Sequence, residues 1–345
     1  MAVSVAAGVA AITSALPWLL PYRVVLGVAA VAGVAFANLR GVRESGTIFA
    51  VPTYLFIGSF AAMLGYGFVQ FLLGSPPVVA GRPLPSQSAD LGLFLILHAF
   101  ASGCTALTGI EAVSDGVPAF KPPEARNARA VLAWMALILG TLFLGITLLS
   151  SWHGIVPSEE ETVVSQLART VFGTSFFYYE VQVVTTLILI LAANTSFADF
   201  PRLSFFLARD GFVPRQFGNR GDRLVFSNGI LILGGLAALL IMGFQGDTHS
   251  LIPLYAVGVF VSFTLSQASM VRRWIRTREP GWSWRAAVNG VGAATTGIVM
   301  LVIAGTKFVH GAWLVVALIP LLMGACLAVN RHYRRSGGAA LARAM

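Results

Sequence analysis

The stretch that decides the fold reads FLILHAFASGCTALTGIEAVSDGVPAF, residues 94–120. It is apolar enough for a membrane helix, yet Gly103 and Gly109 lie in its middle with two threonines between them. Glycine costs about 1 kcal/mol relative to alanine inside a helix, so regular helix is weakened there. We therefore expect a membrane helix that is unwound around Gly103 and Gly109. Backbone carbonyls and half-helix ends would then be available to an ion or substrate.

The composition of the whole chain requires a lipid environment. Of its 345 residues, 57 % are apolar and 11 % are charged, and the mean hydropathy is +0.79. Soluble domains carry about 25 % charged residues, because their outer face must stay wet. This excludes a soluble enzyme, a disordered chain and a nucleic-acid partner, although the net charge is +9. The chain is predicted to be an all-α membrane protein.

Ten apolar stretches are long enough, or nearly long enough, to cross a bilayer, which takes about 20 residues per helix. They are residues 1–16, 23–39, 46–73, 91–118, 128–150, 175–198, 224–244, 249–270, 287–306 and 311–329. No Lys or Arg precedes the first stretch, so we interpret it as a short membrane span and not as a signal peptide. The predicted organisation is a transmembrane domain over 1–330 and a short basic cytoplasmic tail over 331–345.

The basic residues orient these spans. Of the 23 Lys and Arg residues, all but Arg23, Arg82, Arg169 and Lys307 lie in loops after even-numbered spans or in the tail. Basic residues concentrate on the cytoplasmic side of membrane proteins. We therefore expect a multi-pass protein of the cell membrane with both termini in the cytoplasm.

A carboxylate within a membrane span is costly and marks a functional candidate. Glu111 is such a residue, because it lies deep in the fourth stretch. The alternative is a glycine-rich helix that packs closely on a neighbour, with Glu111 neutral and hydrogen-bonded. Ser4 and Tyr255 are weaker candidates on the first and eighth stretches. Taken alone, such residues are more often packing or interface residues.

The sequence carries no nucleophile–base pair, no Walker-type phosphate loop and no His-rich metal cluster. Neither an enzyme nor a resident cofactor or metal is therefore expected. Cys104 and Cys326 both lie within apolar stretches and are interpreted as packing residues, without a disulfide.

Several segments resemble the amino acid–polyamine–organocation (APC) superfamily of permeases. GIEAVSDGVPAFKPPEARNA (109–128) resembles its sixth helix, and ANTSFADFPRLSFFLARDGFVPRQF (193–217) resembles its eighth. With AVSVAAGVAAITSALP (2–17) and NLRGVRESGTIFAVPTYLF (38–56), the closer resemblance is to KimA-type potassium importers of the Kup potassium-uptake family. The resemblance implies a LeuT-like bundle of two inverted repeats.

The same resemblance implies residue roles. It places potassium-coordinating oxygens on Ser4, Thr108 and Tyr255 and makes Glu111 the proton-coupling carboxylate. Neutral oxygens suit potassium because they replace its weakly held water shell. The expected function is proton-coupled potassium uptake, with potassium and a proton as the transported ions. An amino acid permease of the same superfamily and a non-transporting truncated fragment remain alternatives.

Compared with these importers, the chain corresponds to helices three to twelve. The first repeat is therefore expected to be incomplete, without the first two helices. The C-terminal cytoplasmic domain that senses a cyclic dinucleotide is also expected to be absent. The expected partner is the lipid bilayer, and assembly of the chain with a second copy of itself as a homodimer is left open.

Overall fold

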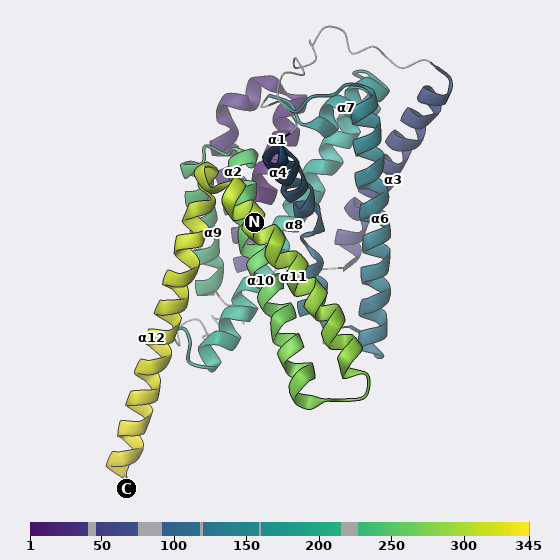
Figure 1. Ribbon diagram of the computed structural model, residues 1–345. Coiled ribbons are helices and arrows are strands. Elements are labelled where there is room, and N and C mark those ends of the chain that lie inside the picture. The colour runs from purple at the N-terminus through teal and green to yellow at the C-terminus, as the bar shows by residue number, and fades with distance from the viewer. Residues whose placement is uncertain (41–45, 75–91, 118–119, 159, 215–226, 345) are drawn as a thin grey trace. The chain divides into compact units, whose positions relative to one another are not determined.

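The computed structural model describes residues 1–40, 46–74, 92–117, 120–158, 160–214 and 227–344, and these are almost entirely helical (Figure 1). The helices are α1 Ala2–Ala15, α2 Arg23–Leu39, α3 Gly46–Leu72, α4 Leu93–Cys104, α5 Ile110–Asp115, α6 Glu124–Trp152, α7 Val163–Phe172, α8 Phe176–Arg209, α9 Ser227–Gly243, α10 Thr248–Thr277, α11 Trp282–Thr306 and α12 Trp313–Ala344. Short non-α turns follow α1, α4 and α11. No strand occurs in the described ranges. The predicted all-α class is confirmed.

Seven helical segments in the described part of the chain are long and apolar enough to cross a membrane. Three shorter apolar helices, α1, α4 and α9, accompany them. Together they account for the ten predicted stretches, so the chain is a multi-pass membrane protein. Long apolar side chains cover the outside of these helices, as lipid contact requires, and Trp134 on α6 is 64 % exposed.

Two helical features were not predicted. Helix α7 is a short amphipathic helix, too polar on one face to stand out as an apolar stretch. It begins at Thr162, whose side chain accepts a hydrogen bond from the Ser165 backbone N–H at 3.2 Å. Helix α12 continues through the predicted tail to Ala344.

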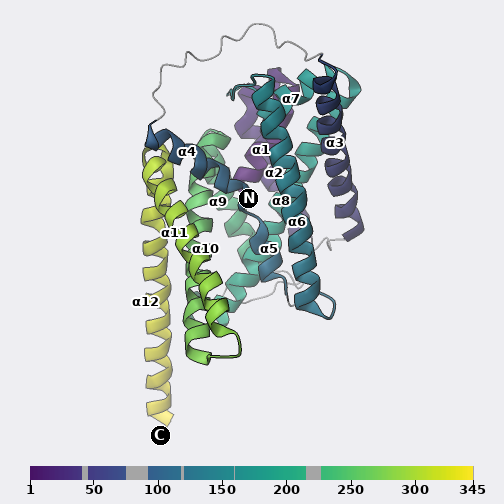
Figure 2. The ribbon, with the colours of Figure 1, turned by 45° about the vertical axis from the view of Figure 1, so that its right-hand side comes forward.

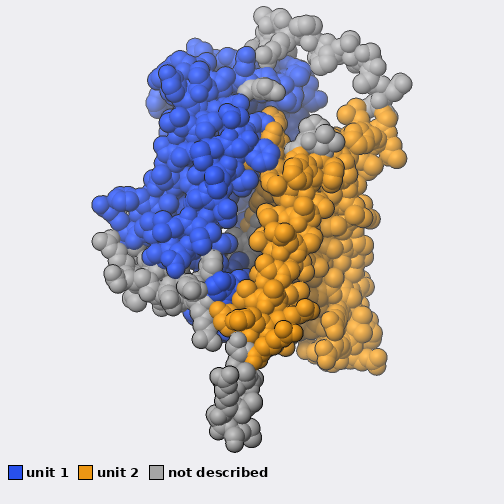
Figure 3. Space-filling model, turned by 90° about the vertical axis from the view of Figure 1, so that its left-hand side faces the viewer, with its two compact units in different colours: residues 1–86, 110–248 blue, residues 87–109, 249–345 orange. Residues whose placement is uncertain are grey.

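The chain forms two compact units, drawn in blue and orange in Figure 3. Unit 1 comprises residues 1–86 and 110–248, and α8 is its central helix. Helix α8 packs against α1, α2, α3, α7 and α9. One apolar cluster gathers around Leu149, Leu167 and Val181, and a second around Val5 and Ile241.

Polar bonds join α1 to α8 within unit 1. The Thr186 hydroxyl donates to the Gly8 carbonyl at 3.2 Å, and the Tyr178 hydroxyl donates to the Ser14 carbonyl at 3.2 Å. The two helices are close at Gly8, where an added Cβ would be in ordinary van der Waals contact with the Leu189 Cβ at 3.5 Å. Small residues and interhelical hydrogen bonds are the means by which membrane helices associate.

Unit 2 comprises residues 87–109 and 249–345. Helices α10 and α11 run side by side as a hairpin (Figure 2). The buried Phe260 of α10 packs in one cluster with Ile303 of α11 and Ala101 of α4. The Thr264 and Thr296 hydroxyls join the two hairpin helices by a hydrogen bond of 3.0 Å. Gly281, with a φ of +78°, makes the turn before α11, a conformation that favours glycine.

The contact of α8 with α9 leads to a stability prediction. A Cβ at Gly229 would lie 3.0 Å from the Cβ and 3.2 Å from the Cα of Pro201, whose ring is rigid. We expect Gly229→Val to lower the free energy of unfolding by about 1–3 kcal/mol, the usual range for overpacking. The measurement is the midpoint of thermal unfolding in detergent.

Gly235→Val is the matched control, because it lies on the same helix and a Cβ there meets nothing within 4 Å. Equal midpoints for the two variants would contradict the close packing of Gly229 on Pro201.

Candidate functional site

The fourth apolar stretch is interrupted in the structure. Helix α4 ends at Cys104 and is followed by a single 3-10 turn, Thr105–Leu107. Thr108 is extended (φ −73°, ψ 154°), Gly109 has a φ of +103°, and α5 then begins at Ile110. The backbone of Gly109 is one that L side chains rarely adopt, which is the physical reason for glycine at this position.

The structure corrects the expectation for Gly103. This glycine lies in the last turn of α4 and is helical, not unwound. A Cβ at Gly103 meets nothing within 4 Å, so close packing does not require glycine there either. Helix propensity alone could not distinguish the two glycines, because the interruption depends on the backbone dihedrals of Thr108 and Gly109.

The hydroxyl of Thr108 is placed with its oxygen lone pairs available. Its proton is donated to the Thr105 carbonyl at 2.7 Å, and the backbone N–H of Thr108 donates to the same carbonyl at 3.2 Å. A hydroxyl whose proton is committed in this way can still accept a hydrogen bond or coordinate a cation through its lone pairs. The Thr108 oxygen is therefore chemically suited to a cation.

Ser4 lies on α1, half-buried beside the fully buried Val5. Among the described residues its hydroxyl makes no hydrogen bond. By contrast, the hydroxyls of Thr13 and Ser14, near the C-terminal end of α1, both donate to the Ala10 carbonyl. The Ser4 oxygen thus has its full hydrogen-bonding capacity within the described part of the chain.

Tyr255 lies in the first half of α10 and is half-buried. Pro253 precedes it inside the same helix. Proline has no N–H to donate to the carbonyl four residues earlier, which is that of His249. The segment that presents Tyr255 is therefore a second place in unit 2 where the regular helical bonding is incomplete.

Glu111 is the second residue of α5, directly after the interruption, and its side chain lies outside the described residues. The boundary between the two units falls between Gly109 and Ile110. Thr108 and Tyr255 therefore belong to unit 2, whereas Ser4 and Glu111 belong to unit 1. The four residues are thus divided between the two units, two in each.

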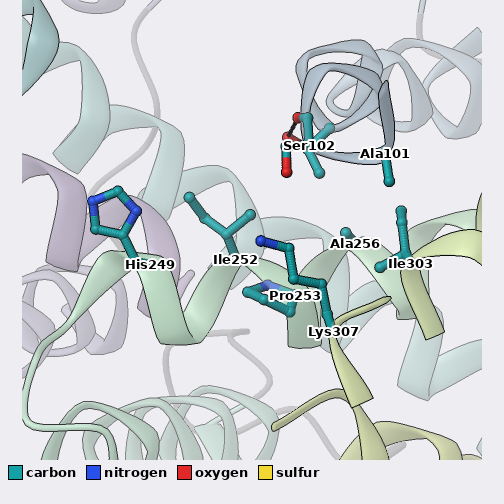
Figure 4. Close-up of a pocket in the computed structure, with 9 residues that line it drawn as sticks. Ala101, Ser102, His249, Ile252, Pro253, Ala256, Ile303 and Lys307 are labelled. Atoms are coloured by element: carbon teal, nitrogen blue, oxygen red, sulfur yellow. Dashed lines mark hydrogen bonds between the residues drawn. The ribbon is translucent and has the colours of Figure 1, made fainter. Parts of the chain in front are cut away.

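Unit 2 contains a cavity of about 130 Å³ where α4, α10 and the end of α11 meet (Figure 4). Its walls are Ala101, Ser102, Thr105, His249, Ile252, Pro253, Ala256, Ile303 and Lys307. Thr105 joins this cavity to the interruption, because its carbonyl accepts the Thr108 hydroxyl.

The cavity is basic. The Lys307 ammonium group points into it in Figure 4 and lies 2.6 Å from the His98 Nε2. The ammonium form of Lys307 has donors only, so in that form the imidazole nitrogen is the acceptor. Burial lowers the pKa of Lys307 from its usual value, because the charged form loses water. A cavity that holds a basic side chain suits a potassium ion poorly, so the candidate ligands remain Ser4, Thr108 and Tyr255.

Sequence reasoning missed this pair. The charge pattern marked Lys307 only as an exception, and nothing in the sequence around His98 indicated that it contacts this lysine. The two residues are 209 positions apart. Local sequence pattern carries no signal for such a contact.

Comparison with known proteins agrees with this architecture. Residues 1–326 match the family described as amino acid permease, so the chain belongs to that family, within the APC superfamily. It is also 46 % identical, over 338 residues, to the potassium transporter KimA of Bacillus subtilis. The match covers 98 % of this chain and 56 % of KimA, so the chain spans little more than half the length of that relative. The expected family relationship is confirmed.

The interruption generates a prediction about Gly109. We expect Gly109→Ala to lower the free energy of unfolding by about 1–3 kcal/mol, because alanine is strained at a φ of +103°. The measurement is the thermal unfolding midpoint of the purified chain in detergent. Gly103→Ala, in the last turn of α4, is the control and should cause no loss. A midpoint lowered by Gly103→Ala but not by Gly109→Ala would contradict the position of the interruption.

Proposed function

We propose that this chain is the membrane part of a proton-coupled potassium importer. The observation that carries the proposal is the helix interruption at Thr108–Gly109, with a carboxylic residue two positions later. Secondary transporters place substrate and ion sites at such interrupted helices. The identity to KimA over almost the whole chain supports potassium as the substrate.

The chemistry of the candidate ligands favours potassium. Ser4, Thr108 and Tyr255 offer neutral hydroxyl oxygens, and the interruption adds backbone carbonyls. Such oxygens replace the water shell of a large, weakly hydrated cation without binding it too tightly to release. Thr108 meets this requirement best, since its proton is already donated to Thr105.

Glu111 is the proposed proton carrier. A carboxyl group at membrane depth is neutral unless a partner or water stabilises its charge. If Glu111 exchanges its proton between the two open states of the transporter, each transported potassium ion is coupled to a proton. The resting protonation state of Glu111 then follows the pH of the side to which the site is open.

The proposed location is the cell membrane, with both termini in the cytoplasm. This orientation rests on the distribution of Lys and Arg residues, which follows the alternation of spans along the chain. The cavity with Lys307 then lies toward the outside, and the turn between α10 and α11 lies toward the cytoplasm.

An amino acid permease is the second candidate, favoured by the description of the matched family. The discriminating experiment uses the chain reconstituted in liposomes with an inward proton gradient. Uptake of rubidium as a potassium analogue, with no uptake of a mixture of labelled amino acids, is the expected result. The reverse pattern would replace the proposal with the second candidate. A rise of the unfolding midpoint with potassium but not sodium reports binding even where uptake is slow.

The role of Glu111 is tested by Glu111→Gln. We expect it to remove the dependence of rubidium uptake on the proton gradient, lowering uptake at an outside pH of about 6 by roughly tenfold, which corresponds to about 1.4 kcal/mol. Glu160→Gln, at an exposed position, is the control. If the Glu111→Gln variant responds to the proton gradient with the same rubidium uptake as the unmodified chain, the proton-carrier role is refuted.

The ion ligands are tested by Thr108→Val and Tyr255→Phe. Loss of one polar contact to a charged group costs about 1.5–3 kcal/mol, so we expect a roughly tenfold to hundredfold higher KM for rubidium. The controls are Thr147→Val and Tyr54→Phe. The exposed hydroxyl of Thr147 donates to the Phe143 carbonyl of its own helix, and Tyr54 is 73 % exposed. A change in protein abundance with an unchanged KM would make Thr108 and Tyr255 packing residues.

A further inference from the structure

Arginines are concentrated where α10 turns into α11. Residues 272–285 include five of them and one acidic residue, Glu279. The arginines are Arg272, Arg273, Arg276, Arg278 and Arg285. All five side chains are exposed. The positive-inside rule explains why basic residues occur at this end of a hairpin, but not how they are arranged.

Three of these arginines line one open hollow on the last turns of α10. Its walls are Arg272, Arg273 and Arg276 together with Ser269 and Thr277. Arg276 lies one turn after Arg272 and Arg273, so its guanidinium group can share a ligand with either of them. We name this hollow, with these five residues, the arginine hollow.

The charge of the arginine hollow is not compensated within the described part of the chain. Glu279 lies 3.9 Å from Arg285, which is not part of the hollow. None of the three lining arginines has an ion pair or a side-chain hydrogen bond with another described residue. The Ser269 hydroxyl donates to the Ser266 carbonyl, and the Thr277 hydroxyl donates to the Arg273 carbonyl. The guanidinium groups are therefore the available donors of the hollow.

Aromatic rings place this hollow at the edge of the membrane. The guanidinium carbons of Arg273 and Arg285 lie 5.8 Å and 4.9 Å from the ring centre of Trp274. The indole nitrogen of Trp274 is buried and makes no hydrogen bond among the described residues. Trp284, at the start of α11, is 74 % exposed. Tryptophan is typical of the level of lipid headgroups, where the ring is apolar on one side and wet on the other.

The geometry points to a ligand with a phosphate group. Guanidinium groups bind phosphate through two parallel N–H donors, and three of them surround one hollow. The hollow is formed by the last residues of the apolar segment Thr248–Thr277, just before the turn to Trp282–Thr306, and such helix ends lie at the level of the phospholipid phosphates. Charge complementarity favours a lipid with net negative charge over a zwitterionic one.

We propose that the arginine hollow binds the phosphodiester of an anionic phospholipid headgroup. The assignment to the cytoplasmic leaflet rests on the orientation proposed above. The binding itself does not depend on potassium transport. Its test measures lipid binding, so its failure is distinguishable from failure of the transport proposal.

The experiment titrates the purified chain, in neutral detergent, with phosphatidylglycerol, phosphatidylcholine or inorganic phosphate. Native mass spectrometry counts the retained lipids, and the unfolding midpoint follows their effect on stability. We expect phosphatidylglycerol to be retained and to raise the midpoint, whereas phosphatidylcholine has little effect. In the triple variant Arg272→Gln, Arg273→Gln, Arg276→Gln the affinity should fall at least about tenfold, since loss of one hydrogen bond to a charged group costs about 1.5–3 kcal/mol, or roughly tenfold or more.

The matched control is Arg331→Gln, Arg334→Gln, Arg335→Gln on α12, which removes the same charge from exposed positions outside the hollow. Because neutral detergent provides no anionic surface, it should change the affinity for phosphatidylglycerol by less than about twofold. Equal losses in the two triple variants would overturn the proposal in favour of general surface charge. Protection by inorganic phosphate that matches the lipid would overturn the assignment to a lipid. Should the triple variant fold poorly, Arg276→Gln alone provides the same comparison against Arg334→Gln.

Discussion

The constraint on which this structure depends is the cost of an unpaired backbone group in hydrocarbon, several kcal/mol for each N–H or C=O. It explains why the described chain is helical almost throughout. It also makes the interruption between Cys104 and Ile110 an exception that needs support. Part of the support is local, because the Thr105 carbonyl accepts both the N–H and the hydroxyl of Thr108. The carbonyls at the end of α4 that lose their helical partners are the groups that an ion can satisfy.

Unit 1 is held together by polar contacts as much as by apolar packing. Lipid is as apolar as leucine, so burial of apolar surface does little to hold membrane helices together. In unit 1, Thr186 and Tyr178 of α8 bond to carbonyls of α1, the helix that carries Ser4. The Ser14 hydroxyl accepts the Thr162 N–H at 3.1 Å and so ties α1 to the start of α7. These bonds fix the position of α1, the helix that carries the candidate ligand Ser4.

Basic residues serve different purposes in different places. Their distribution along the chain is the basis of the proposed orientation of the spans, which depends on the sum of charges. The contact of Lys307 with His98 belongs to a cavity, where burial lowers the lysine pKa and the position of one ammonium group matters. The three arginines near the end of α10 line one hollow without acidic partners among the described residues. All of these residues contribute to the net charge of +9, and that sum does not distinguish their roles.

The sequence by itself determined the class of protein, the ten apolar stretches and the interruption in the fourth. These follow from composition, span length and helix propensity, which act over a few neighbouring residues. Only the tertiary structure decided that Gly109 and not Gly103 has the positive φ, and that the Thr108 proton is committed to Thr105. It alone paired Lys307 with His98, set Gly229 against Pro201 and revealed α7. Such features depend on backbone dihedrals and on neighbours distant in the chain, and neither is encoded in a local pattern of apolar and polar residues.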